Sequence, residues 1–201
     1  MNNKDWVGNS NSVFKSLSAS NHTNTEREEH DYYATDTIAI DKLLMGGAKL
    51  APNLWECACG NGCLSKKLEE YGYNVKSTDL VDRGYGQGGV DFLEVEDKFD
   101  GDIITNPPYK YAQDFVEKGL ELIPNGNKVY MFLKLQFLEG KKRRALFDKH
   151  ELKTVYVSSE RILCAKNADF DAMRRNGGSA VAYAWYEFEK GYNGYPTIKW
   201  I

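Results

Sequence analysis

The chain has 201 residues, of which 42% are apolar and 27% are charged. This length and composition suit one globular domain with a full core and exclude a large modular enzyme. Every apolar run is shorter than the roughly 20 residues that a membrane helix requires. The first thirty residues are polar and unlike a signal peptide, so we expect a soluble, cytoplasmic protein without membrane contact.

Cysteine spacing and net charge exclude further classes of protein. The four cysteines contain no CxxC pair, so we expect neither a metal site nor a disulfide framework. A formal net charge of −3 argues against a protein that coats nucleic acid through charge alone. The segment from Lys141 to Arg175, however, contains ten Lys or Arg and five Asp or Glu. It is therefore either an ordinary solvated face or a phosphate-facing surface.

Strand-like and helical patterns alternate along most of the chain. Residues 1–30 are rich in Asn and Ser and are expected to form a polar arm, either disordered or lying over a ligand, before one domain over residues 31–201. Helices are predicted at Asp36–Met45, Leu64–Tyr71 and Gly140–His150, and the apolar face formed by Ala112, Phe115, Val116 and Leu120 predicts one more. Strands are predicted at Leu54–Cys57, Val75–Leu80, Val90–Phe92, Asp102–Thr105 and Val129–Leu133. This alternation predicts an α/β domain with parallel strands and helices on both faces.

The C-terminal part departs from that alternation. Thr154–Val157 and Ala180–Phe188 have the pattern of extended segments, so an antiparallel strand is predicted to complete a mostly parallel seven-stranded sheet. Between them, Ser158–Ser179 is predicted to be a long loop, which is typical of either a functional or a disordered segment.

A glycine-containing turn follows the first strand of the domain, with the sequence Glu56-Cys57-Ala58-Cys59-Gly60-Asn61-Gly62. Small residues at such a turn let a ligand approach the backbone, and a carboxylate at the strand end can bind hydroxyl or amino groups. Ser65 stands where the dinucleotide fingerprint G-x-G-x-x-G needs its third glycine, and no Walker-type phosphate loop is present.

Carboxylates also stand at the ends of the next two predicted strands. Asp79 lies twenty-three residues after Glu56, next to Leu80, and is expected to accept hydrogen bonds from the ribose hydroxyls of an adenosine-containing ligand. Asp91 and Phe92 are expected to bracket an adenine, with the carboxylate accepting from the amino group and the ring packing on the base.

The sequence Asn106-Pro107-Pro108-Tyr109 ends the fourth predicted strand. Its prolines fix two φ angles and remove two backbone donors, which leaves the Pro107 carbonyl rigid and free to accept beside the Asn106 amide oxygen. Two acceptors that hold both hydrogens of an exocyclic amine favour a tetrahedral nitrogen whose lone pair faces a methyl group. Tyr109 is expected to stack on the base that carries the amine.

These motifs, in this order, resemble class I methyltransferases that use S-adenosylmethionine. Glu56, Gly60 and Gly62 match the E/D-x-G-x-G-x-G signature, with Ala58 replacing its first glycine, and Asp79 matches the ribose acid. Asn106–Tyr109 is similar to the (N/D)-P-P-(Y/F) motif of enzymes that methylate the 6-amino group of adenine in DNA. Tyr33 and Thr35 resemble part of an N-terminal cofactor motif of these enzymes, although Asp36 replaces the expected proline. From about Asn21 onward, the chain looks like small adenine methyltransferases of phages and other mobile elements.

The resemblance implies a single Rossmann-like methyltransferase domain, S-adenosylmethionine as cofactor and DNA as substrate. The implied cofactor-binding residues are Tyr33, Thr35, Glu56, Ala58, Gly60, Gly62, Asp79, Leu80, Asp91 and Phe92, and the implied catalytic residues are Asn106, Pro107, Pro108 and Tyr109. No segment has the size of a separate target-recognition domain, so DNA contact is expected from Lys141, Lys142, Arg143, Arg161, Phe170, Arg174 and Arg175. Methylation of RNA bases and a catalytically inactive binding protein with this fold remain alternatives.

Overall fold

The computed structural model describes residues 33–149, 152–166, 170–175 and 181–201, all within the unit Asp31–Ile201. The polar arm expected over residues 1–30 lies outside the described residues.

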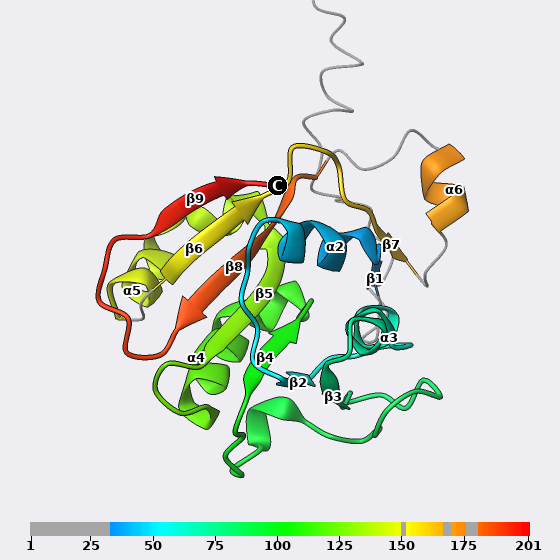
Figure 1. Ribbon diagram of the computed structural model, residues 1–201, viewed down its shortest axis with the longest axis horizontal. Helices are drawn as coiled ribbons and strands as arrows, with labels where there is room; N and C mark the ends of the chain where they lie inside the picture. Colours follow the sequence, from blue (N-terminus) through cyan, green and yellow to red (C-terminus); the bar gives the residue numbers. More distant parts are fainter. Residues whose placement is uncertain (1–32, 150–151, 167–169, 176–180) are drawn as a thin grey trace, which may run out of the picture. The chain divides into compact units, whose positions relative to one another are not determined.

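A seven-stranded sheet in the order β3-β2-β4-β5-β8-β6-β9 forms the centre of this unit (Figure 1). Its strands are β2 (Asn53–Glu56), β3 (Asn74–Ser77), β4 (Asp102–Thr105), β5 (Lys128–Lys134), β6 (Leu152–Val157), β8 (Tyr183–Glu189) and β9 (Thr197–Trp200). Neighbouring strands are parallel from β3 to β5, and β8 runs antiparallel between β5 and β6. The predicted α/β class, the mostly parallel sheet and its antiparallel strand near the C-terminus are confirmed.

Helices cover both faces of the sheet, as the alternation predicts (Figure 1). One face carries α2 (Ile38–Met45) and α3 (Cys63–Glu70), and the other carries α4 (Ala112–Leu122) and α5 (Lys141–Lys149). Consecutive strand residues point to opposite layers, so Ile104 packs with the α2 and α3 layer while Ile103 packs with the α4 and α5 layer. None of the helices in the described ranges is long and apolar enough to cross a membrane.

The strand expected at Val90–Phe92 is absent from the described sheet, which corrects that prediction. Phe92 instead begins the short 3₁₀ helix η1 (Phe92–Glu94), whose first turn is capped by the Asp91 carboxylate. The backbone of Gln87, and not Val90–Phe92, pairs with the end of β3, because the Gln87 N–H donates to the Ser77 carbonyl at 2.9 Å. Gly86, with a φ of 69°, lies directly against that carbonyl and allows the close return of the loop.

The segment Ser158–Ser179 contains regular structure that the sequence analysis did not predict. Strand β7 (Cys164–Lys166) pairs antiparallel with β1 (Tyr33–Thr35), and helix α6 (Phe170–Arg175) follows. The expectation of a continuous loop was therefore wrong over these residues. The β1–β7 pair is a separate two-stranded ribbon that reaches the candidate active site.

Candidate active site

The predicted cofactor and catalytic motifs follow neighbouring strands at one edge of the sheet. The glycine turn leaves β2, Asp79 follows β3, and Asn106 follows β4 directly. The chain passes from β2 to β3 on one side and from β4 to β5 on the other, so the strand order reverses between β2 and β4. Open α/β sheets bind ligands in the crevice outside the carboxyl ends of such strands.

A carboxylate ties the glycine turn to the end of β3. Gly60 and Gly62 have φ values of 57° and 81°, which glycine adopts without the strain a side chain would bring. The Asp79 carboxylate accepts from the Gly60 N–H at 2.8 Å and from the Val81 N–H at 2.9 Å. Each carboxylate oxygen has a second lone pair, so the ribose contact expected of Asp79 stays a prediction compatible with these bonds.

Glu56 lies beneath the glycine turn and is only 2% exposed. The Ser65 hydroxyl donates to this carboxyl group and itself accepts from the Ser77 hydroxyl at 2.8 Å. Burial raises the pKa of Glu56 to about 8, because desolvation of the charged form outweighs the hydrogen bond from Ser65. A cation bound beside Glu56 would favour the ionised form and lower this pKa.

Phe92 does not lie where a base can stack on its ring. Its side chain is 2% exposed, with ring centroids 5.3 Å from Trp55 and 5.0 Å from Phe115. The adenine-packing role predicted for this ring is thus contradicted, because the ring is part of the core beneath α4. Asp91 and Leu80 are exposed, and Ala58 is half-buried against the same core.

The Asn106 amide is held in one orientation by strand β1. Its Nδ2 donates to the Thr35 hydroxyl at 2.9 Å and to the Tyr33 carbonyl at 3.3 Å. A carbonyl oxygen can only accept, so the NH₂ end of the amide must face β1. The other end, Oδ1, is buried and has no hydrogen-bond partner. Within the described residues, no hydrogen bond reaches the Pro107 carbonyl oxygen either.

An unpaired buried oxygen costs about 1–3 kcal/mol, and a catalytic role is one reason for a native structure to keep such a group. The Asn106 oxygen therefore offers an acceptor to a donor that binds at the end of β4.

Three residues that the sequence analysis missed hold Tyr109 in place. Its hydroxyl donates to Cys164 Sγ at 3.7 Å, its ring lies 6.1 Å from the ring of Tyr183, and Lys134 Nζ lies 5.2 Å from its centroid. Burial raises the pKa of Tyr109 well above its ordinary value and that of Cys164 to about 11, so both groups are neutral at physiological pH. The partners come from β5, β7 and β8, and only the position of Lys134 at the end of a predicted strand gave any signal.

The predicted substrate-binding residues are in different situations. Arg143 donates from Nη1 to the carbonyls of Gln136 at 2.6 Å and Glu139 at 2.8 Å, so this nitrogen stabilises the end of the 3₁₀ helix η3 (Leu135–Leu138) and is unavailable for the predicted phosphate contact. Exposed side chains are those of Lys141, Arg161 and Arg175, and Phe170 is half-buried. The side chains of Lys142 and Arg174 are outside the described part of the structure.

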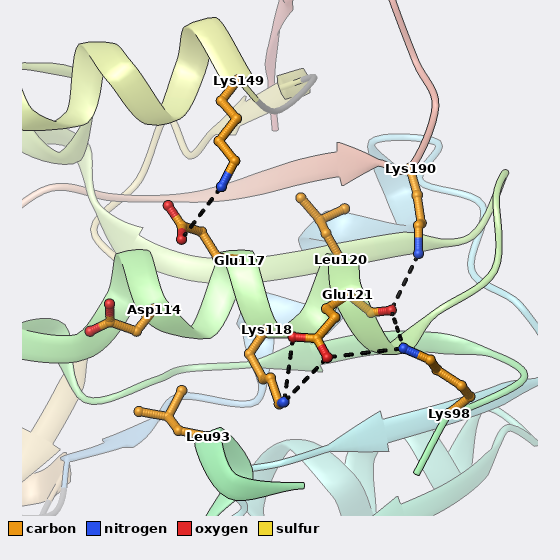
Figure 2. A pocket seen from close by; sticks show the side chains of 9 residues that line it. All are labelled: Leu93, Lys98, Asp114, Glu117, Lys118, Leu120, Glu121, Lys149 and Lys190. Atoms are coloured by element: carbon orange, nitrogen blue, oxygen red, sulfur yellow. Dashed lines mark hydrogen bonds and ion pairs between the residues drawn. The ribbon is translucent and has the colours of Figure 1, made fainter. Parts of the chain in front are cut away.

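A hollow of about 790 Å³ on the outer face of α4 is distinct from this site (Figure 2). Its lining side chains are Leu93, Lys98, Asp114, Glu117, Lys118, Leu120, Glu121, Lys149 and Lys190. Its lysines are already paired: Lys118 with Glu121 at 3.4 Å, Lys149 with Glu117 at 3.9 Å, and Lys98 and Lys190 with the Glu121 carbonyl (Figure 2). None of the predicted site residues lines it.

Several solved structures share this architecture. A protein from Listeria monocytogenes assigned to the class I S-adenosylmethionine-dependent methyltransferases matches with a TM-score of 0.50 and 13% identity, over 82% of this chain and 62% of that one. A Pyrococcus horikoshii protein assigned as an RNA methyltransferase matches with a TM-score of 0.51 and 14% identity, over 77% and 84% of the two chains. The modification subunit of a protein assigned as a type I restriction enzyme from Vibrio vulnificus matches with a TM-score of 0.55 and 13% identity, over 88% of this chain and 48% of that one.

The sheet order and these likenesses show that the chain has the Rossmann-like fold of class I methyltransferases. The chain spans less than two thirds of the Listeria and Vibrio proteins. No protein-family model matches the sequence, and no curated protein matches it.

Proposed function

We propose that this protein transfers a methyl group from S-adenosylmethionine to the exocyclic 6-amino group of adenine in DNA. The observation that carries the proposal is the Asn106 amide, with its NH₂ end fixed on β1 and its buried oxygen unpaired at the carboxyl edge of the sheet. The fold supports the reaction class, and the Asn-Pro-Pro-Tyr motif supports adenine in DNA as the acceptor.

The residues at the glycine turn fit the proposed cofactor. Gly60 and Gly62 carry no side chains, and the carboxyl groups of Glu56 and Asp79 lie at the ends of β2 and β3. Acidic groups suit a sulfonium cation, which carries no phosphate. When bound, S-adenosylmethionine supplies an electrophilic methyl group.

The catalytic motif would hold the amine in a reactive geometry. Asn106 Oδ1 and the Pro107 carbonyl accept its two hydrogens, which reduces delocalisation of the nitrogen lone pair into the ring and directs the lone pair toward the methyl group. The nitrogen would bond to the methyl carbon as the carbon–sulfur bond of the sulfonium breaks and a neutral thioether leaves, by direct in-line displacement without a covalent enzyme intermediate, and the methylated amine would then release a proton to solvent. Tyr109, fixed by Cys164 and Tyr183, provides an aromatic surface for the base.

An adenine in duplex DNA must be swung out of the helix to reach this edge, at a cost of a few kcal/mol. The exposed side chains of Lys141, Arg161 and Arg175 would bind phosphates. RNA is the rival substrate, because one protein of similar fold is assigned as an RNA methyltransferase and basic side chains suit either polymer.

A filter assay for radiolabelled methyl transfer to duplex DNA, single-stranded DNA, RNA and protein tests the proposal. We expect DNA to be labelled at the 6-amino group of adenine, and sequencing of the modified DNA would identify the target. Labelling of RNA alone would refute DNA as the substrate. Absence of heat on titration with S-adenosylmethionine would instead favour a binding protein without catalysis.

Two substitutions separate the chemical step from cofactor binding. Asn106→Ala should abolish transfer and leave the affinity for S-adenosylmethionine nearly unchanged, whereas Asp79→Ala should weaken that affinity. Asn74→Ala is a matched control, because this exposed asparagine lies at the opposite edge of the sheet and its side-chain amide donates to Asn53 Oδ1 at 3.0 Å. Loss of cofactor binding in Asn106→Ala would contradict this division of roles.

A further inference from the structure

Strand β1 contacts the catalytic motif through a buried threonine. Thr35 is 2% exposed, and its hydroxyl accepts from Asn106 Nδ2 at 2.9 Å. The antiparallel register pairs Thr35 with Cys164 of β7, and Cys164 accepts from the Tyr109 hydroxyl. The β1–β7 ribbon thus holds both ends of Asn106–Tyr109.

The Thr35 hydroxyl is suited to accept rather than donate at Asn106. Its side chain also hydrogen-bonds with Cys164, whose sulfur is a weak acceptor for hydroxyl protons. When the Thr35 proton points to that sulfur, the oxygen lone pairs are left for the Asn106 NH₂ group. The Tyr33 carbonyl at 3.3 Å and Cys164 Sγ at 4.0 Å are further and more distant acceptors for the same NH₂ group, so the Thr35 hydroxyl makes the shortest of its three contacts.

This arrangement matters because an amide has two chemically opposite ends. If the Asn106 amide turned by 180°, its NH₂ group would face the substrate amine, and two sets of donors would oppose each other. The acceptors on β1 favour the productive orientation, with the oxygen toward the amine.

We propose that Thr35 is a positioning residue that fixes the orientation of the Asn106 amide for the amine acceptor. This inference rests on the proposed function, and it gives Thr35 a role different from the cofactor contact that the N-terminal motif implies. Thr35 acts through Asn106 and touches neither the methyl donor nor the base.

Thr35→Val tests the role, because valine keeps the β-branched shape of threonine and removes the hydroxyl. We expect kcat for methyl transfer to fall by about 100-fold, the scale of a misplaced reacting group, while KM for S-adenosylmethionine changes less than about twofold. Thr35→Ser restores the hydroxyl and should keep kcat within about threefold of the wild-type value. Thr197→Val, a substitution of the same kind on the exposed strand β9, should leave kcat unchanged.

A second measurement reports the contact independently of activity. Nuclear magnetic resonance can assign the side-chain amide protons of Asn106 from the signal that is missing in Asn106→Ala. We expect these protons to exchange with deuterium at least about 10-fold faster in Thr35→Val than in Thr35→Ser. If the wild-type protein methylates no nucleic acid, the proposed function fails, and this exchange difference still tests the contact.

The inference is overturned if Thr35→Val keeps the wild-type kcat, or if the exchange rates of the two variants agree. A raised KM for S-adenosylmethionine at unchanged kcat would also overturn it, since Thr35 would then bind the cofactor. If Thr35→Val does not fold, Thr35→Ala removes the same hydroxyl without added bulk and carries the same expectations.

Discussion

The buried carboxyl group of Glu56 makes the cofactor side of the site sensitive to pH. The ordinary pKa of Glu56 is 4.5, and its pKa in the folded protein is about 8. At pH values between these two, the folded protein keeps a proton on Glu56 that the unfolded chain has released. A rise in pH through this window therefore favours the unfolded chain, and the contribution of the protonated group to stability is lost.

We predict that the free energy of unfolding falls by up to about 1.4 kcal/mol per pH unit between pH 5 and 8 because of this group. Glu56→Gln should remove most of that slope, since an amide does not titrate. Denaturant unfolding at several pH values measures it, and Glu94→Gln, at an exposed carboxylate on η1, is the control that should keep the slope. Equal slopes in the wild type and Glu56→Gln would show that Glu56 does not keep its proton in this range.

Side-chain positions were predictable from the sequence where a motif directly follows a strand, and were missed where elements distant in the sequence meet. Strand ends placed Glu56, Asp79 and Asn106 at a common edge. The stacking role predicted for Phe92 was wrong, because nothing local reveals that Trp55 and Phe115 enclose its ring.

At the scale of elements, the turn between β2 and α3 packs tightly against the loop that follows β3. A Cβ atom on Gly62 would lie 2.3 Å from the ring of Tyr85. That ring is restrained, because its hydroxyl donates to Glu69 at 3.2 Å and Lys66 Nζ lies 4.7 Å from its centroid. Gly62 is therefore required both for its left-handed backbone and for the absence of a side chain.

A matched pair of substitutions separates these two requirements. Gly62→Ala and Gly89→Ala both place alanine at a left-handed φ, 81° and 74°, but nothing lies within 4 Å of the new Cβ at Gly89. We expect each to lose about 1 kcal/mol of stability through the backbone, and Gly62→Ala to lose at least about 1 kcal/mol more through overpacking. Chemical denaturation gives both values, and Tyr85→Ala in the Gly62→Ala background should recover the excess. Equal losses at the two glycines would mean that Tyr85 moves aside freely.

The elements themselves were predicted where the apolar pattern is strong and local, and missed where pairing is long-range. Strand β4 has the predicted bounds, Asp102–Thr105, because its residues are all buried. The β1–β7 ribbon joins short segments about 130 residues apart, and three-residue strands carry no periodicity that a sequence pattern can reveal. The end of β3 pairs with Gln87, because the glycines of the following loop let the chain turn back sharply beside the strand. The strand-like composition of Val90–Phe92 gave no sign of this turn.

For the molecule as a whole, the carboxyl edge of the sheet and the opposite edge have different roles. The carboxyl edge holds the glycine turn and Asn106, where an oxygen is left unpaired. The opposite edge holds Asp102, a buried carboxylate at the start of β4 that accepts from the backbone N–H groups of Ala51 and Lys128, each at 2.8 Å, and from the Asn127 side chain at 3.2 Å. Three chain segments are thus fastened at the edge away from the proposed chemistry.

Asp102→Asn should consequently reduce stability and spare catalysis. The two Asp102 oxygens accept from different segments, so an amide must turn its NH₂ group toward a backbone N–H and lose at least one of these bonds, at a cost of about 1.5–3 kcal/mol for a charged acceptor. Asp100→Asn, two residues earlier at an exposed carboxylate, should change stability by less than about 0.5 kcal/mol. Denaturant unfolding and the methyl-transfer assay, both at a temperature where each variant is folded, measure the two effects separately. The Asn106 acceptor lies at the far end of the same strand. A loss of kcat in Asp102→Asn without a loss of stability would therefore mean that a change at one end of β4 alters the other end, and that the two edges of the sheet are not independent.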